Sequence, residues 1–235
     1  MQKAIVIGHR GASAYAPENT ILSFETAWRM KADMVELDVH ATSDGHLVCI
    51  HDDNVSRITG MSGLVAEMTL KEIRSLDAGR GQRIPLLSEV LNLSKGKFGV
   101  NIEIKVRNIE EDLLRLVTER SVLGSVIFSS FLHPTLRELR EMSAEAKTAV
   151  LYGEPINDPV QYALELGSNA INPLFYLLTP EHVSLAHKSG LKTYPWTVDD
   201  PDMMLELVSM GVDGIITDIP DVARKTIDTY LALHK

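Results

Sequence analysis

The sequence predicts an α/β protein with the (β/α)8 architecture, the TIM barrel, in which eight parallel strands close on themselves. Its 235 residues match the size at which such barrels form one domain. From residue 85 onwards, short apolar runs typical of buried parallel strands alternate with segments of helical periodicity. Gly167, Gly190 and Gly211 follow three of these helices and can end them in the left-handed conformation. An open doubly wound sheet is the alternative, but that fold more often has five or six strands.

The first two βα units begin close to the amino terminus. The first predicted strand covers residues 4–8, and a helix begins near Glu18-Asn19-Thr20. Asn19 is a candidate for a helix cap or a loop-shaping residue. The second predicted strand covers residues 33–39, where apolar side chains alternate with acidic ones.

A hairpin and a short irregular segment follow the second strand. Asp44-Gly45 lies between two apolar runs, which is a strong hairpin signal because glycine tolerates positive φ. The return strand at 47–51 is therefore predicted to extend the second strand rather than to join the barrel. Residues 52–83 are rich in glycine and contain one helical pattern, at 70–76. We expect them to form a small insertion in a single domain of residues 1–235.

The remainder of the chain alternates regularly between strands and helices. The predicted strands are residues 98–105, 126–129, 148–152, 170–172, 192–197 and 212–217. The predicted helices are residues 86–93, 108–121, 134–142, 157–166, 180–189, 200–210 and 220–233. Together with the first two units, this gives eight βα repeats, and right-handed crossovers of such repeats close a barrel.

The composition excludes several classes of function. A net charge of -9 and the absence of any run of Lys or Arg argue against nucleic-acid binding. The single Cys49 lies in an apolar strand, has no intramolecular partner, and is expected to be a buried thiol. The first apolar run, residues 4–7, is too short for a signal peptide or a membrane anchor, so the sequence predicts a cytoplasmic protein.

Three acidic residues are predicted to meet at the carboxyl ends of two strands. Glu36 and Asp38 share one face of the second strand because side chains alternate with a period of two. Glu103 lies near the end of residues 98–105, and active sites of βα barrels form at this end. Three carboxylates are suited to Mg²⁺ or Ca²⁺, whereas no cluster of Cys or His suggests zinc. A single Glu-x-Asp pair would more often be a solvated edge or part of a salt bridge.

Basic residues and two histidines accompany these acids. Lys105 shares a face with Glu103, and Arg10 follows the first strand. Arginine, lysine and a divalent cation together favour an anionic substrate, with phosphate the simplest choice. His9 and His51 also lie at strand ends, and imidazole can act as base or acid near neutral pH. Taken alone, His51 would more often be a loop residue.

At this point the sequence resembles the glycerophosphodiester phosphodiesterase family. The motifs that carry the resemblance occur in order along nearly the whole chain: His9-Arg10-Gly11, Pro17-Glu18-Asn19-Thr20, Glu36-Leu37-Asp38, His51-Asp52, Ile84-Pro85-Leu86, Glu103-Ile104-Lys105, Trp196-Thr197 and Thr217-Asp218-Ile219-Pro220. Asp199, where Asn is expected, and Leu86, where Thr is common, depart from the pattern without touching the expected chemistry.

The resemblance implies a TIM barrel that uses a divalent cation, Mg²⁺ or Ca²⁺, to hydrolyse glycerophosphodiesters to glycerol 3-phosphate and an alcohol. It implies that His9 and His51 form the catalytic pair. The implied metal ligands are Glu36, Asp38 and Glu103. The implied substrate contacts are Arg10 and Lys105 for the phosphate, with Trp196 as a wall of the pocket. The attacking group, water or a hydroxyl of the substrate, and the assignment of base and acid stay open.

Two other functions remain alternatives. The apolar run of residues 173–178 at the barrel mouth would admit the chain of a lysophospholipid, form a homodimer contact, or pack against neighbouring loops. A catalytically silent barrel that binds glycerophosphate is the third hypothesis. It is disfavoured because such a protein would not need both histidines and all three acids.

Overall fold

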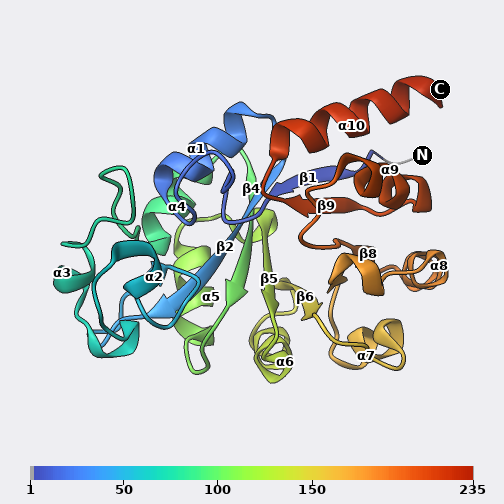
Figure 1. Ribbon diagram of the computed structural model, residues 1–235. Helices are drawn as coiled ribbons and strands as arrows, with labels where there is room; N and C mark the ends of the chain where they lie inside the picture. Colours follow the sequence, from blue (N-terminus) through green and yellow to red (C-terminus); the bar gives the residue numbers. More distant parts are fainter. Residues whose placement is uncertain (1–2, 235) are drawn as a thin grey trace.

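The computed structural model describes residues 3–234, and within them eight parallel strands form a nearly closed barrel (Figure 1). The barrel strands are β1 (Ile5–Gly8), β2 (Met34–Ala41), β4 (Gly99–Ile104), β5 (Val126–Ser130), β6 (Lys147–Tyr152), β7 (Ala170–Pro173), β8 (Lys192–Thr193) and β9 (Gly214–Thr217). Backbone hydrogen bonds join β8 to β9 across the remaining seam, from Asp213 N to Thr193 O (3.1 Å) and from Ile216 N to Pro195 O (3.0 Å). The predicted TIM barrel is confirmed.

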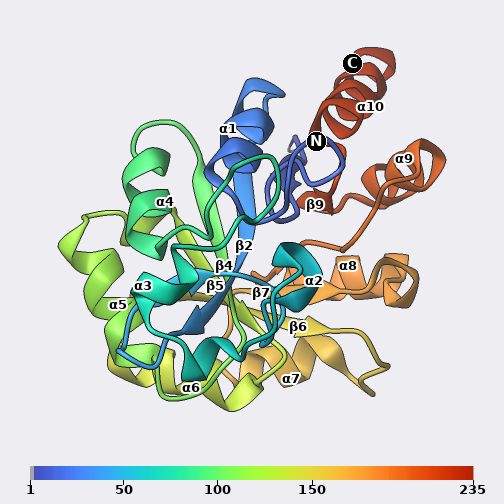
Figure 2. The same ribbon diagram turned by 60° about the vertical axis from the view of Figure 1, so that its left-hand side comes forward.

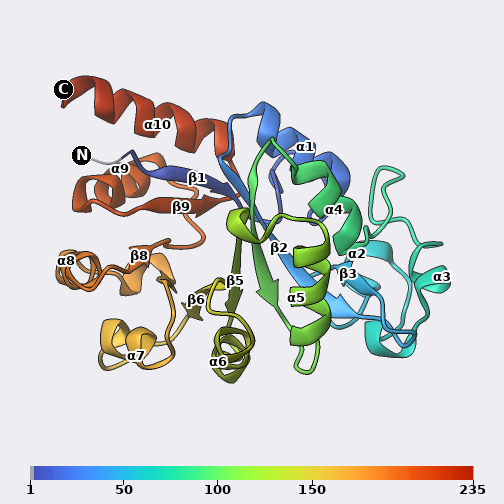
Figure 3. The ribbon, with the colours of Figure 1, turned by 180° about the vertical axis from the view of Figure 1, so that it is seen from behind.

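The hairpin adds a strand outside the barrel, as the sequence predicts. β3 (Leu47–Cys49) pairs antiparallel with β2, with Val39 opposite Cys49. Figure 3 shows β3 beside the carboxyl end of β2. Its return brings His51 back toward the end of the barrel that carries the acidic residues.

Helices surround the strands (Figure 2). Their bounds are α1 (Ile21–Arg29), α4 (Leu87–Ser94), α5 (Glu110–Glu119), α6 (His133–Met142), α7 (Pro159–Glu165), α8 (Pro180–Lys188), α9 (Pro201–Met210) and α10 (Pro220–Leu233). Thr20, Asp158, Thr179 and Asp200 cap α1, α7, α8 and α9 by accepting a hydrogen bond from a first-turn backbone N–H. None of the helices within residues 3–234 combines the length and the apolar character that a membrane crossing needs.

The segment between β3 and α4 contains more structure than the sequence indicates. Beside α3 (Leu70–Ile73), where one helix is predicted, it forms α2 (Ser56–Thr59) and the 3-10 helix η1 (Val65–Glu67). Helices this short have too few residues for a periodic pattern to show in the sequence. The segment has a small apolar core of its own around Val55, Val65 and Ile73. Figure 2 shows α2 and α3 in front of the carboxyl end of the barrel.

The predicted strand at 192–197 is too long. Regular pairing ends at Thr193, because Pro173 of β7 has no backbone N–H to donate to β8, and Pro195 has none to donate on the side of β9. The chain nevertheless continues in an extended path, since Tyr194 N donates to Ile171 O (3.0 Å) and Trp196 N to Pro173 O (3.0 Å). Trp196 therefore still reaches the carboxyl end of the barrel.

The interior of the barrel is divided into an apolar half and a polar half. Its apolar layer consists of Ile7, Met34, Ala149, Ala170, Tyr194 and Ile216. Toward the carboxyl ends of the strands, the buried residues are polar: Glu36, Asp38, Asn101, Glu103, Ser129 and Asn172. A polar interior at this end is where a βα barrel places its chemistry.

The apolar run at 173–178 is mostly packed rather than exposed. Phe175 and Leu177 lie in the 3-10 helix η3 (Phe175–Leu177) and pack against the main core, and Leu178 is buried. Tyr176, with 65% of its surface exposed, is the outward-facing aromatic residue of the run. Packing against neighbours thus accounts for most of this segment.

Candidate active site

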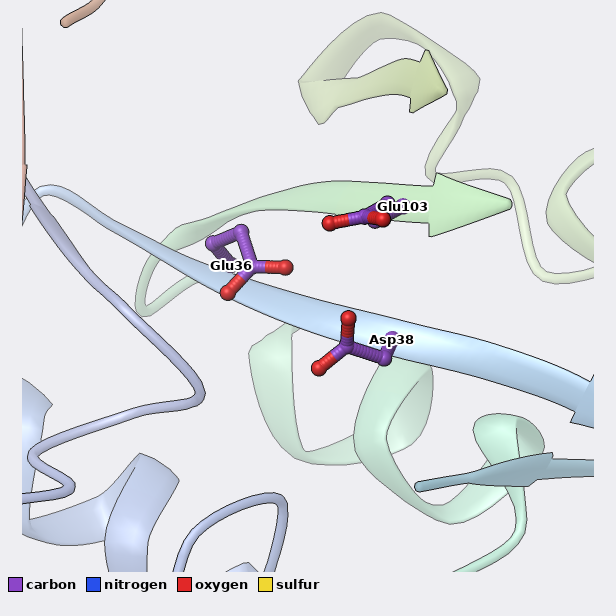
Figure 4. Close-up of side chains that lie close together, drawn as sticks. All are labelled: Glu36, Asp38 and Glu103. Atoms are coloured by element: carbon purple, nitrogen blue, oxygen red, sulfur yellow. The ribbon is translucent and has the colours of Figure 1, made fainter. Parts of the chain in front are cut away.

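The acidic residues of β2 and β4 converge on one point inside the barrel. Asp38 lies directly opposite Glu103 in the parallel register of the two strands, and Glu36 lies two residues earlier on the same face as Asp38. Each residue offers a carboxylate oxygen within 4.8 Å of the others, and all three are buried. Figure 4 shows the three carboxylates pointing toward a shared space.

Burial and mutual repulsion disfavour full ionisation of this group. Burial raises the pKa of Glu36 to about 8, and the charge of Asp38 adds to the effect. Burial also raises the pKa of Glu103 to about 7, with the charge of Asp38 again the next cause. A cation or bound protons must therefore accompany the three side chains.

Two of these carboxylates still have unused oxygens. Among the described residues, Glu36 Oε1 and Asp38 Oδ1 are buried and accept no hydrogen bond. A buried polar atom without a partner is costly, and a divalent cation with oxygen preference would satisfy it. The donor set therefore fits Mg²⁺ or Ca²⁺.

Arg10 and Lys105 place positive charge beside the acids. The backbone N–H of Arg10 donates to Glu36 Oε2 (2.8 Å), and its Nε lies 3.4 Å from Asp38 Oδ2. Lys105 Nζ donates to Glu103 Oε1 (2.7 Å) and lies 3.4 Å from Asp38 Oδ1. Burial alone would lower the pKa of both bases, but the neighbouring carboxylates outweigh it and raise both values.

Each of the two histidines is held by a carboxylate at Nδ1. His9 Nδ1 lies 2.6 Å from Asp218 Oδ1, and His51 Nδ1 lies 2.6 Å from Asp52 Oδ1. Burial alone would lower the pKa of His9, but the hydrogen bond to Asp218 and the charge of Glu36 outweigh it and raise the pKa. Because Nδ1 is engaged in both rings, Nε2 is the atom that can exchange a proton with a ligand.

Both histidines line one small cavity together with most of the other predicted residues. The cavity has a volume of about 120 Å³. Its lining residues are His9, Arg10, Glu36, His51, Asn101, Glu103, Ser129, Phe131, Leu151, Trp196 and Ile216. Asp38 and Lys105 complete the charged group through the contacts described above. All eight side chains that the sequence singles out are thus brought together.

Trp196 is fixed in the cavity wall by two contacts. Its Nε1 donates to Asn172 O (2.9 Å), and its ring meets that of Phe131 edge to face at a centroid distance of 5.6 Å. These contacts fix the orientation of the indole in the wall of the cavity that Glu103 also lines.

Sequence reasoning missed several residues that support this site. Thr20, rather than Asn19, caps α1; Asn19 instead donates from Nδ2 to Asp38 Oδ2 (2.8 Å) while its own φ is 54°. An Asn is one of the few non-glycine residues that tolerate this conformation. Of the two roles that the sequence offers for Asn19, the cap is wrong, whereas its positive φ agrees with a loop-shaping residue. Asp218 appears in the sequence only as part of the motif Thr217-Asp218-Ile219-Pro220, and its contact with His9, 209 positions away, leaves no local signal.

Comparison with known proteins places the chain in a family. The model of the glycerophosphoryl diester phosphodiesterase family matches residues 9–222. A glycerophosphodiester phosphodiesterase of Caldanaerobacter subterraneus subsp. tengcongensis is 43% identical over 232 residues, covering 93% of this chain and 96% of the relative. One of Bacillus subtilis is 33% identical over 257 residues, covering 97% and 88%.

Solved structures agree with the sequence relatives. An Oleispira antarctica phosphodiesterase in complex with the product sn-glycerol-3-phosphate has a TM-score of 0.87 at 28% identity, covering 96% of this chain and 97% of its own. A glycerophosphodiester phosphodiesterase from Agrobacterium tumefaciens has a TM-score of 0.85 at 28% identity, covering 96% and 100%. The chain therefore belongs to the glycerophosphoryl diester phosphodiesterase family of enzymes.

Proposed function

We propose that this protein hydrolyses small glycerophosphodiesters, such as glycerophosphocholine and glycerophosphoethanolamine, to sn-glycerol 3-phosphate and an alcohol. The observation that carries the proposal is the convergence of three buried carboxylates and two carboxylate-held histidines on one cavity. The complex of the Oleispira antarctica relative with sn-glycerol-3-phosphate supports the assignment of the product. We further propose that residues 1–235 act as a single barrel domain in which 52–83 is an insertion.

Glu36, Asp38 and Glu103 would hold one divalent cation, Mg²⁺ or Ca²⁺. Their convergence and the unused oxygens of Glu36 and Asp38 support this role. When bound, such a cation supplies charge that withdraws electron density from the phosphorus. Asn19 and Lys105 would keep Asp38 and Glu103 in the orientation that the site requires.

Arg10 and Lys105 would contact the phosphate oxygens. Arg10 follows the carboxyl end of β1, and Lys105 follows that of β4. Their two positive charges therefore flank the acidic group. Arginine can hold two phosphate oxygens at once, whereas lysine acts as a point charge. Trp196 and Phe131 would border the glycerol or alcohol part of the substrate.

His9 and His51 would carry the protons of the reaction through Nε2. One histidine takes a proton from the attacking water molecule or hydroxyl group, and the other gives a proton to the departing alkoxide. Asp218 and Asp52 fix the tautomer of each ring by holding Nδ1. The scheme accommodates attack by water and attack by a substrate hydroxyl that forms a cyclic phosphate.

The test is release of sn-glycerol 3-phosphate from glycerophosphocholine by purified protein with Mg²⁺ or Ca²⁺. We expect turnover that EDTA stops and that His51→Ala lowers by a factor of about 100 or more. His46→Ala is the matched control, because His46 lies on the hairpin outside the cavity and should leave turnover unchanged. Activity that survives both EDTA and His51→Ala would contradict the mechanism. Tight binding of sn-glycerol 3-phosphate without turnover would indicate the silent barrel instead.

A lysophospholipid is the competing substrate. Exposed Phe131 and Tyr176 favour it, because they could accompany an acyl chain outside the cavity. Comparing turnover of glycerophosphocholine with that of a long-chain lysophosphatidylcholine separates the two. We expect the water-soluble diester to be preferred, since most of the 173–178 run is packed against the core.

A further inference from the structure

Arg57 joins the inserted segment to two carboxylates at the barrel mouth. It lies in α2, and its guanidinium donates from Nε and Nη2 to Asp52 Oδ2 (2.6 Å) and Oδ1 (3.2 Å). The same group donates from Nη1 and Nη2 to Glu18 Oε2 (2.8 Å) and Oε1 (2.7 Å). Arg57 thus holds two carboxylates, each through both oxygens, which uses the fixed fork geometry of arginine fully.

Both carboxylates also bind a residue that lines the cavity. Asp52 Oδ1 holds His51 Nδ1 at 2.6 Å, and Glu18 Oε1 accepts from Arg10 Nη1 at 2.9 Å. The Arg57 guanidinium is therefore connected to His51 through one residue, Asp52, and to Arg10 through one residue, Glu18. The three segments that it connects are the loop before α1, the end of the hairpin and α2.

The electrostatics support a firm connection. The hydrogen bond from Arg57, opposed by a smaller effect of burial, is the main reason why the pKa of Asp52 is lowered to about 2. Hydrogen bonds to Glu18 and Asp52 raise the pKa of Arg57 itself. Both carboxylates are thus charged throughout the neutral range, and their orientation is set by contacts on two sides.

We propose that Arg57 is a positioning residue, through which the inserted segment fixes the ring of His51 by way of Asp52 and the guanidinium of Arg10 by way of Glu18. The proposal rests on the function proposed above, because it gives His51 and Arg10 their importance. The side chain of Arg57 is 47% exposed, so its ion pairs add little to stability. Its substitution should therefore affect turnover much more than folding.

Another ion pair provides a matched control. Arg74, the C-cap residue of α3, pairs with Glu89 of α4 and so also ties the inserted segment to the barrel. Within residues 3–234, neither residue has a hydrogen bond or ion pair with a side chain that lines the cavity. If Arg57 served only to anchor the segment, Arg57→Gln and Arg74→Gln would have similar effects.

The kinetic experiment compares Arg57→Gln, Arg57→Lys and Arg74→Gln with the native protein, using glycerophosphocholine and Mg²⁺ or Ca²⁺. We expect Arg57→Gln to lower kcat/KM by about 10- to 100-fold. This range is typical of removing a residue that orients a metal ligand through a hydrogen bond. Arg57→Lys should show an intermediate loss, since a point charge cannot hold both carboxylates in the same way. Arg74→Gln should stay within about twofold of native turnover.

A double variant separates the two routes. Because the Asp52 route acts on His51, kcat of Asp52→Asn/Arg57→Gln should lie within about threefold of kcat of Asp52→Asn alone. The Glu18 route acts on Arg10, so Arg57→Gln should still raise KM in the Asp52→Asn background. Losses in kcat that multiply in the double variant, or native turnover in Arg57→Gln, would overturn the proposal.

A crystal structure of Arg57→Gln gives a readout that does not depend on activity. We expect the His51 ring or the Arg10 guanidinium to turn away from its native position, while the barrel is unchanged. Both side chains in their native positions would reject the positioning role whatever the kinetics. If the native protein showed no turnover but Arg57→Gln displaced these side chains, the proposed function would fail and the positioning role would stand.

Discussion

At the scale of single residues, His9 and His51 share one arrangement although they come from different parts of the chain. In each ring a carboxylate holds Nδ1 at 2.6 Å, which fixes the proton on that atom and leaves Nε2 as the nitrogen that can exchange a proton. For His9, the hydrogen bond to Asp218 and the charge of Glu36 outweigh burial and raise the pKa of the ring. The two rings therefore share the way in which Nδ1 is held.

Asp218→Asn should change the pH dependence of catalysis. The charge of Asp218 and its hydrogen bond help to raise the pKa of His9 against the effect of burial, so their removal should lower that pKa. We expect kcat/KM to fall by about tenfold or more. The limb of the pH–rate profile that reflects the ionisation of His9 should move to lower pH. The measurement is a pH–rate profile from pH 5 to 9. Asp221→Asn, at an exposed partner of Tyr15 close by, is the control and should leave the profile unchanged.

Asn19→Gly tests how the acidic group is oriented. Glycine accepts the positive φ of this position without strain but removes the amide that donates to Asp38. We expect the affinity for Mg²⁺ or Ca²⁺ to fall by about 10- to 100-fold, as when other outer partners of metal ligands are lost. Calorimetric titration measures it. Asn54→Gly, at a half-buried residue whose Oδ1 accepts from Ser56 N outside the acidic group, should retain native affinity, and unchanged affinity in Asn19→Gly would refute the role.

At the scale of elements, the strands explain which part of the site can be predicted from sequence. The alternation of β2 places Glu36 and Asp38 on one face, and the parallel register of β4 sets Glu103 opposite Asp38. The alternation is local, and the carboxyl ends of successive barrel strands lie at the same end of the barrel, so the acidic group can be predicted once the fold class is. The contact between His9 and Asp218 depends instead on β1 lying beside β9, the last strand of the chain. It can be found only once the barrel is closed.

The inserted segment shows which contacts cannot be predicted from the sequence. α2 has four residues and η1 three, so their side chains complete no periodic pattern. Nothing in the sequence around Arg57 indicates its contacts with Glu18 and Asp52. The shortened β8 is explained by the missing N–H groups of Pro173 in β7 and of Pro195, but the backbone hydrogen bonds of Tyr194 and Trp196 preserve the path. Strand identities were therefore predictable, whereas the contacts between loops were not.

Gly8→Ala tests the close approach at the end of β1. A Cβ atom added there would lie 2.5 Å from the carbonyl oxygen of Gly11 and 3.0 Å from Cβ of Ala27. Backbone cannot yield as a flexible side chain does, so the loop that carries His9 and Arg10 must shift. We expect a loss of about 1–3 kcal/mol in the free energy of unfolding, measured by urea denaturation. Gly124→Ala, where nothing lies within 4 Å, should cost much less; equal costs would contradict the steric explanation.

At the scale of the whole molecule, the barrel combines a stabilising half and a functional half. The apolar layer around Ile7 and Ile216 fills the interior below the site. Above it, Asn101 Oδ1 and Ser129 Oγ are buried without a hydrogen-bond partner among the described residues. Such atoms cost free energy unless a ligand or water satisfies them. The upper half of the barrel is therefore the part whose stability should depend most on what is bound.

This dependence should appear in the pH profile of thermal stability. Burial raises the pKa of Glu36 from 4.5 to about 8 and that of Glu103 from 4.5 to about 7. Above pH 4.5 and below its raised pKa, each carboxyl keeps a proton in the folded chain that it has released in the unfolded chain. The stability of EDTA-treated protein should therefore fall as the pH rises from 5 to 8.5. A bound divalent cation favours the charged carboxylates and should reduce this fall. The increase in Tm on adding Mg²⁺ or Ca²⁺ should therefore grow with pH.

The variant Glu36→Gln/Glu103→Gln shows whether these two carboxyls are the cause. It retains the size of both side chains but has no proton to lose at either position, so the Tm of its EDTA-treated form should vary less between pH 5 and 8.5. It should also gain little in Tm from either cation, since one carboxylate remains of three. Differential scanning calorimetry measures both quantities. If the double variant kept the native slope, the pH dependence would belong to other groups, and Glu36 and Glu103 would be ionised in the folded chain as they are in the unfolded one.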